Sequence, residues 1–304
     1  MMLTLSGIAA ILIIATLVVF IMKRVRPEKD FTELEQRIKS WWIMASIFFL
    51  AIILSKNASI IFFAFVSFLA LKEYFSVIET RRADRRVLLW AYIAIPIQYY
   101  WIAAGWYGMF IIFVPVYMFL FLPLRMVLVG ETQGFLKAAG TIHWGLMKTV
   151  FCLGHVAYLL ALPAANNPIG GSAALVLYLV MLTELNDVAQ FMFGKMFGKH
   201  KVVPQVSPKK TWEGLLGGIG TTICLAFLLG PYFTPMNRLE SLFAGIIIGL
   251  GGFIGDIVMS AVKRDTGIKD SSDLLPGHGG ILDRIDSLMY TAPLFFHYIY
   301  YLYF

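Results

Sequence analysis

The chain has 304 residues, of which 59% are hydrophobic and only 14% are charged. Soluble proteins carry roughly 25% charged residues, so this composition excludes an ordinary soluble domain and indicates a polytopic membrane protein. The net charge of +7 is modest, and both cysteines, Cys152 and Cys224, lie inside apolar runs. We therefore expect neither a nucleic-acid partner nor a disulfide framework.

Apolar segments recur along the whole chain, and no polar block is long enough to form a separate soluble domain. The predicted segments are 3–22, 41–54, 58–71, 87–104, 106–122, 141–161, 172–194, 213–231, 241–262 and 287–304. Because a full span needs about 20 residues, the second and third are short, and they are either tilted spans or a re-entrant hairpin broken near Ser55. The prediction is an all-α integral membrane protein with about eight to ten transmembrane helices.

The basic residues indicate how these segments cross the membrane. With the N-terminus outside and all ten segments spanning, all but three of the 25 lysines and arginines fall in loops on the cytoplasmic side. The exceptions are Lys56, Lys148 and Arg238. This asymmetry agrees with the positive-inside rule. In a bacterium the protein would lie in the inner (plasma) membrane, with its polar loops after residues 194 and 260 in the cytoplasm.

We treat residues 1–304 as a single membrane domain. Residues 1–140 are apolar and aromatic with ordinary basic loops, and the chemically unusual residues lie in 141–304. The N-terminal helices are therefore expected to support the site, and the C-terminal helices and loops are expected to carry it.

Asp187 begins the first of two candidate regions. It lies within a predicted span, where an ionisable side chain marks a functional site by default. Two glycine–lysine pairs and a polar loop follow it, with Gly194, Lys195, Gly198, Lys199, Ser207 and Lys210. Lysines act as point charges on phosphates, and glycines beside them permit close approach. The alternative is a basic loop that contacts anionic lipid headgroups.

The second region, residues 260–286, is rich in acids, bases and glycines and lies between two apolar segments. It would be costly in hydrocarbon, so we place it at the membrane surface or along a polar cavity. Asp256 precedes it, and Asp283 and Asp286 end it. One or two carboxylates with substrate phosphates can hold Mg²⁺. The alternatives are pairing of Asp256 with nearby bases, and helix capping by the other two acids.

Cations and glycines accompany these acids. The basic candidates for neutralising phosphates are Lys263, Arg264, Lys269 and Arg284. The loop at 276–280 contains His278, Gly279 and Gly280, and its glycines let backbone N–H groups approach phosphate oxygens. His278 taken alone is equally well explained as a hydrogen-bonding loop residue.

The two regions resemble the motifs of phosphatidate cytidylyltransferases, also called CDP-diacylglycerol synthases. The terminal match runs through Ser260, Lys263-Arg264, Lys269-Asp270, Pro276, His278-Gly279-Gly280, Asp283-Arg284 and Asp286. The upstream match runs through Asp187, Gly194-Lys195, Gly198-Lys199, Ser207-Pro208 and Lys210-Thr211-Trp212-Glu213-Gly214. The resemblance is strong from residue 187 onward, and before residue 140 it rests on the hydrophobic pattern alone.

The resemblance implies that CTP and phosphatidic acid are condensed to CDP-diacylglycerol and pyrophosphate. It also implies Mg²⁺, with Asp256 and Asp283 as the central metal-site carboxylates and Asp286 as a further ligand, and it is compatible with a monovalent cation nearby. The catalytic residues are then Asp187, Asp256, Lys263, Arg264 and Asp283. The substrate-binding residues are Lys195, Lys199, Ser207, Lys210, Lys269, His278, Gly279, Gly280 and Arg284.

Other functions stay open at this point. A CTP-dependent lipid kinase would phosphorylate a polyprenyl alcohol and release CDP instead of pyrophosphate. A transporter of anionic lipids fits the intramembrane acids, although the charges gather on one face and no inverted repeat appears. The family usually has small residues and a tyrosine after the first aspartate, whereas this chain has Val188 to Phe191, so a related lipid phosphate is an alternative substrate. Glycine-bearing spans are compatible with a homodimer and equally with packing inside one chain.

Overall fold

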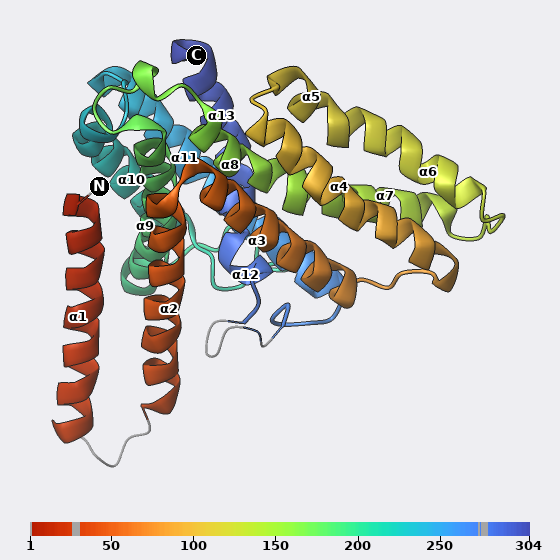
Figure 1. Cartoon of the computed structure of the whole chain (residues 1–304). Coiled ribbons are helices and arrows are strands. Elements are labelled where there is room, and N and C mark those ends of the chain that lie inside the picture. Colours follow the sequence, from red (N-terminus) through yellow and green to blue (C-terminus); the bar gives the residue numbers. More distant parts are fainter. Residues whose placement is uncertain (1, 26–30, 273, 275–278) are drawn as a thin grey trace.

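A computed structural model describes residues 2–25, 31–272, 274 and 279–304, and these residues form a bundle of helices (Figure 1). The helices are α1 (Met2–Val25), α2 (Thr32–Leu54), α3 (Lys56–Val77), α4 (Arg85–Ala103), α5 (Tyr107–Ile112), α6 (Phe119–Val127), α7 (Phe135–Leu146), α8 (Leu153–Ala161), α9 (Gly171–Phe197), α10 (Trp212–Phe233), α11 (Arg238–Asp265), α12 (Leu282–Ile285) and α13 (Leu288–Tyr303). Two π-helical turns, η2 (Phe113–Met118) and η3 (Met147–Cys152), join α5 to α6 and α7 to α8. No strand forms within the described ranges.

Seven helical stretches in the described part are long and apolar enough to cross a membrane. They are 34–54, 56–77, 107–127, 135–161, 171–197, 212–233 and 238–265. This confirms the all-α polytopic class. Each of the ten predicted apolar segments coincides with a helix or a continuous helical run, and α1, α4 and α13 are the three outside this set of seven.

The region predicted as two short spans or a hairpin forms two long helices, α2 with 23 residues and α3 with 22. Hydrophobicity alone underestimated the length of α2. The helix begins at Thr32, in a polar sequence nine residues before the predicted apolar segment. Ser55 separates the two helices in an extended conformation, and its hydroxyl accepts a hydrogen bond from the Ala58 N–H (3.1 Å). This is an ordinary N-cap, which satisfies one of the first free N–H groups of α3.

Side-chain caps also define where the helices that carry the candidate regions begin. Thr211 caps α10, because its hydroxyl accepts from the Gly214 N–H (3.1 Å). Asn237 and Glu240 form a capping box at the start of α11, each side chain accepting from the other's backbone N–H. Such caps are each worth about 1 kcal/mol. They fix the register of α10 and α11, and with it the positions of the polar residues on each helix.

The bundle has one continuous apolar core that includes side chains from both halves of the chain, such as Tyr74, Phe110 and Phe296. Helices α9, α10, α11 and α13 pack closely together, and α8 contacts α3, α4, α9 and α13. Helix α1 packs on α2 at the edge of the molecule (Figure 1). The short helix α12 contacts α3, so the polar C-terminal region lies against the N-terminal half.

Candidate active site

Lys210 and Asp256 come together from different parts of the chain. Their side chains form an ion pair, and the Lys210 ammonium also donates to Gln190 Oε1 (3.2 Å) on α9. Ser260, one turn after Asp256 on α11, donates to the Asp256 carboxylate (3.4 Å). The sequence-based alternative to metal binding is pairing of Asp256 with a nearby base, Lys263 or Arg264. The structure pairs it with Lys210 instead, because the α9–α10 connection lies beside α11.

Asp286 lies beside Asp256 and Asp187. Desolvation raises the pKa of Asp286 to about 7, and the negative charges of Asp256 and Asp187 act in the same direction. On α9, the Asp187 Oδ1 atom is buried and accepts no hydrogen bond from the described residues. The three carboxylates, named here the aspartate trio, therefore repel one another, and their neighbouring donors include the Lys210 ammonium on Asp256 and the Ser287 N–H on Asp286.

Glycines on α11 permit this arrangement. A Cβ atom at Gly255 would lie 2.5 Å from the Asp286 carbonyl oxygen and 2.8 Å from Ser287 Cα. A Cβ atom at Gly252 would lie 2.8 Å from Asn186 Nδ2, and the Ser287 hydroxyl donates to the Gly252 carbonyl (3.1 Å). Real Cβ contacts are not this short, so α11 approaches the 286–287 backbone at a distance that only glycine allows.

Asp283 has a different environment from the trio. Its carboxylate is buried, with Oδ1 2.6 Å from the Lys263 ammonium, while Oδ2 accepts from the backbone N–H groups of Ser271 and Gly280, both at 2.9 Å. Burial alone would raise the pKa of Asp283, but the ammonium and the two N–H donors outweigh it and hold this pKa below its usual value. The alternative of helix capping by Asp283 is therefore not met, since both N–H donors, at residues 271 and 280, lie before α12, which has no side-chain cap hydrogen bond.

Gly279 and Gly280 take part in this local structure. Gly279 has φ +79°, in the left-handed region, and a Cβ atom there would lie 2.6 Å from Asp283 Oδ2. The Gly280 N–H, which we expected to face a phosphate, donates to Asp283. His278, Pro276 and Gly277 lie outside the described residues, so their predicted roles stay predictions.

In each glycine–lysine pair, the glycine and the lysine have different roles. A Cβ atom at Gly194 or Gly198 would meet Thr211 Oγ1 at 3.3 or 2.8 Å, so these glycines pack α9 against the start of α10. The Lys195 and Lys199 side chains are exposed. The structure thus brings Lys210 to the aspartates but gives Lys195 and Lys199 no contact with them.

Four other predicted residues lie around this centre. Arg264 Nε donates to the Val206 carbonyl (3.2 Å) and so joins the end of α11 to the α9–α10 connection. Ser207 is partly buried in that connection, where its N–H donates to the Val203 carbonyl (2.8 Å). Lys269 and Arg284 are exposed, which leaves both able to meet a ligand that approaches from solvent.

Sequence reasoning missed Glu73, at the end of α3. Glu73 is 6% exposed, and both of its carboxylate oxygens accept hydrogen bonds from residues 271–272 and 281–282. The rule that singled out Asp187, an acid inside an apolar segment, did not reach Glu73, because the predicted segment ends at residue 71. Helix α3 continues to Val77 and so includes this acid.

The aspartates offer the carboxylate oxygens that a hard cation prefers. Within the described ranges, however, no group of three or more His, Cys, Asp or Glu side chains is placed to hold a metal ion. Mg²⁺ does not need one, because it usually takes one or two carboxylates and completes its coordination with water and substrate phosphates. The mutual repulsion of the trio and the unpartnered Oδ1 of Asp187 are what such a cation would relieve.

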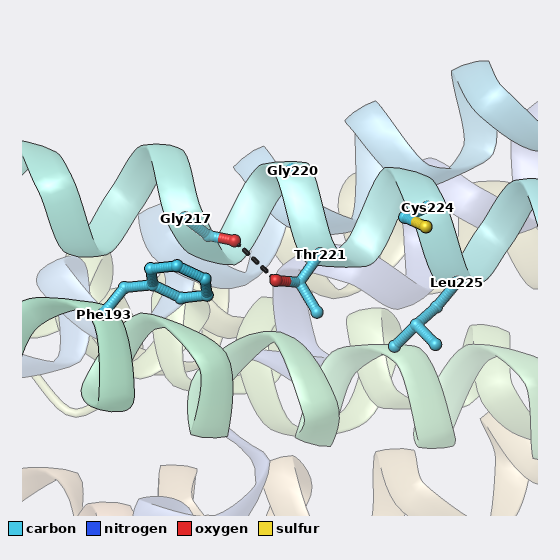
Figure 2. A pocket seen from close by; sticks show the side chains of 6 residues that line it. All are labelled: Phe193, Gly217, Gly220, Thr221, Cys224 and Leu225. Atoms are coloured by element: carbon cyan, nitrogen blue, oxygen red, sulfur yellow. Dashed lines mark hydrogen bonds between the residues drawn. The ribbon is translucent and has the colours of Figure 1, made fainter.

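An apolar groove of about 430 Å³ runs along the outer surface of α9 and α10. Figure 2 shows its lining residues, Phe193, Gly217, Gly220, Thr221, Cys224 and Leu225. The Thr221 hydroxyl, its most polar group, donates back to the Gly217 carbonyl (2.7 Å). No carboxylate, ammonium, guanidinium or imidazole group lines this groove, so it suits a hydrocarbon chain and not the phosphate chemistry of the aspartates.

Comparison with known proteins adds independent information. Residues 35–302 match the model described as "Cytidylyltransferase family". The chain is 48% identical over 299 residues to "Uncharacterized protein YnbB" of Escherichia coli (strain K12), and the match covers 98% of each chain. It is 39% identical over 155 residues to "Phosphatidate cytidylyltransferase" of Staphylococcus aureus (strain COL), which covers 50% of this chain and 59% of that relative. The Staphylococcus epidermidis (strain ATCC 12228 / FDA PCI 1200) relative of the same name is 37% identical over 154 residues, with the same coverage.

Proposed function

We propose a reaction for this chain, which belongs to the cytidylyltransferase family: it condenses CTP with phosphatidic acid, or a related lipid phosphate, to give CDP-diacylglycerol and pyrophosphate. The observation that carries the proposal is the convergence of Asp187, Lys210, Asp256 and Asp286 from segments far apart in sequence, with the Lys263–Asp283 pair at the end of the same helix α11. Similarity to relatives named phosphatidate cytidylyltransferase supports the same reaction.

In the proposed reaction an oxygen of the lipid phosphate attacks the α-phosphorus of CTP. The bond between that phosphorus and the oxygen bridging to the β-phosphate breaks, and pyrophosphate leaves. Because the nucleophile is already an anion, no strong general base is required. The residues of the chain position the two substrates and neutralise their charges. Lys210 and Lys263 are suited to neutralisation, since each ammonium lies beside one of the central aspartates.

We propose Mg²⁺ as the cofactor, held by Asp256, Asp283 and Asp286, where it would neutralise charge on the triphosphate. Asp286 and Asp256 lie in the trio, where Asp256 pairs with Lys210, whereas Asp283 pairs with Lys263 and would bind Mg²⁺ while it keeps that ammonium as a neighbour. Asp187, with its free oxygen, is a candidate for a monovalent cation nearby. Lys269 and Arg284 are proposed as outer contacts for phosphates that arrive from solvent, whereas Lys195 and Lys199 are candidates on the motif alone.

We also propose that this site faces the cytoplasm from the inner membrane of a bacterium. The distribution of lysine and arginine supports this orientation. The seven apolar helices support a lipid substrate drawn from a surrounding bilayer, and the groove on α9 and α10 offers one surface for an acyl chain.

The test is product analysis with purified, detergent-solubilised protein. CTP labelled at the α-phosphate is supplied with phosphatidic acid and Mg²⁺, and both labelled lipid and pyrophosphate are measured. We expect equimolar CDP-diacylglycerol and pyrophosphate, and no product from the matched Asp256→Asn variant, which controls for a contaminating host enzyme. Release of CDP would indicate a lipid kinase. No pyrophosphate with any lipid phosphate, from a folded sample, would exclude the proposed reaction.

A further inference from the structure

Glu73 is a buried carboxylate in the N-terminal half that binds the polar C-terminal region. Its Oε1 accepts from the Ser272 hydroxyl (2.5 Å) and the Ile281 N–H (2.9 Å). Its Oε2 accepts from the Leu282 N–H (2.8 Å) and the Ser271 hydroxyl (3.4 Å). Each oxygen thus holds one residue on the 271–272 side and one on the 281–282 side.

The backbone that Glu73 holds is the backbone that surrounds Asp283. The Ser271 N–H donates to Asp283 Oδ2 while the hydroxyl of the same residue donates to Glu73. Gly280 likewise donates its N–H to Asp283, and a Cβ atom there would lie 2.5 Å from Glu73 Oε2. The second glycine of the Gly279-Gly280 pair therefore permits the approach of Glu73, and the two carboxylates contact the same short stretches of chain.

The chemistry of Glu73 indicates more than a contact between helices. Burying a carboxylate is expensive unless every oxygen is hydrogen-bonded, and an apolar side chain would join two helices at lower cost. A carboxylate packs no better than an apolar side chain, but its two oxygens can hold several N–H and O–H donors in one geometry. Here those donors belong to the segments that flank Asp283.

We propose that Glu73 is a positioning residue for the nucleotidyl-transfer site, acting from the N-terminal half to hold the 271–272 and 280–282 backbone so that Asp283 and Lys263 are correctly placed. The inference rests on the proposed function. Among the described residues, the partners of the Glu73 carboxylate are donors of the protein itself, so we assign it a positioning role and no chemical step. A displacement of about 1 Å in a site of this kind costs about 100-fold in rate.

Three substitutions test the geometry. Glu73→Gln keeps the shape but turns an NH₂ group towards one of the backbone N–H groups of Ile281 and Leu282, which cannot reverse their polarity. Glu73→Asp keeps the charge with a shorter reach. Ser272→Ala removes a single donor and is the mildest change. We expect kcat to fall about 10- to 100-fold in Glu73→Gln, with partial recovery in Glu73→Asp and a smaller loss in Ser272→Ala.

Two matched controls separate positioning from general damage. Glu79→Gln removes an exposed acid just after the same helix and is expected to leave kcat unchanged. Leu71→Ala opens a cavity under a fully buried side chain of α3, so it should lower the melting temperature without lowering kcat per folded molecule.

Amide hydrogen exchange of the peptide spanning 279–285 supplies a readout that does not depend on turnover. We expect faster exchange there in Glu73→Gln, and no change in that peptide in Leu71→Ala. The proposal is overturned if Glu73→Gln keeps kcat and exchange within twofold of the unmodified protein, or if Leu71→Ala reproduces both effects. If the unmodified protein makes no CDP-lipid, the proposed reaction fails, while the exchange result still decides whether Glu73 holds this segment.

Discussion

Glu73 and Asp283 can be compared with the aspartate trio of Asp187, Asp256 and Asp286. The first two are buried, and each accepts from at least two backbone N–H groups. In the trio, by contrast, the charges of Asp256 and Asp187 both disfavour ionisation of Asp286, and Asp187 Oδ1 is without a partner in the described part of the chain. Carboxylates within one polar region can therefore divide into those that backbone donors stabilise as anions and those whose mutual repulsion a bound cation would relieve. The comparison predicts that the two groups respond differently to removal of a charge.

The largest effect is expected for Asp256→Asn. It removes a trio carboxylate that is only partly buried, so we expect turnover to fall about 1000-fold while the melting temperature stays close to that of the unmodified protein. Initial rates of CDP-lipid formation and a thermal unfolding curve on the same sample measure both quantities. Retention of more than a tenth of the activity would remove Asp256 from the centre of the site.

Asp283→Asn should reduce both activity and stability. Breaking a buried ion pair by neutralising one partner costs about 3–5 kcal/mol, and here it also leaves the Lys263 ammonium beside an amide. We expect about a 100-fold loss of turnover and a clear drop in melting temperature, larger than that of Asp256→Asn. Equal stability of the two variants would contradict this division between the two groups of carboxylates.

Lys210→Met is expected to have an intermediate effect. The substitution removes the ammonium that pairs with Asp256 and contacts Gln190, so phosphate neutralisation weakens while the alkyl stem is replaced. We expect kcat/KM for CTP to fall about 10- to 100-fold. Lys210→Arg serves as the control that keeps the charge. If both variants behave like the unmodified protein, Lys210 acts only in helix packing.

The smallest effect is expected for Lys195→Gln and Lys199→Gln. Both side chains are exposed, and their glycine neighbours explain the motif by packing α9 on α10. Surface substitutions usually change stability by less than about 0.5 kcal/mol, and we expect kcat/KM within about threefold of the unmodified protein. A loss above tenfold in either variant would place that lysine in the substrate site, as the motif alone predicts.

The helices and the identity of the polar regions could be read from the sequence, because hydrophobic length and local motifs are encoded over short stretches. The partners of the acids could not. Lys210 pairs with Asp256, and Glu73 binds residues 281 and 282. These partners are so far apart in sequence that no local pattern predicts their contact. The motif glycines were read as phosphate contacts, although Gly194, Gly198 and Gly280 are instead explained by the neighbours that a side chain would strike. Such neighbours depend on tertiary packing.

Gly255 lies directly before Asp256, and it faces the backbone of Asp286 and Ser287. The separation of Asp256 and Asp286 is thus set by a contact between main chains. Rotation of either side chain changes the distance between the carboxylates, but it does not change the distance between the two backbones. A single methyl group at position 255 would act as a spacer, moving one acid away from the other without altering any charge. The distance between Asp256 and Asp286 therefore depends on the absence of a Cβ atom at Gly255. Gly255→Ala, a neutral and apolar change, should impair the site as the loss of a metal-binding aspartate would.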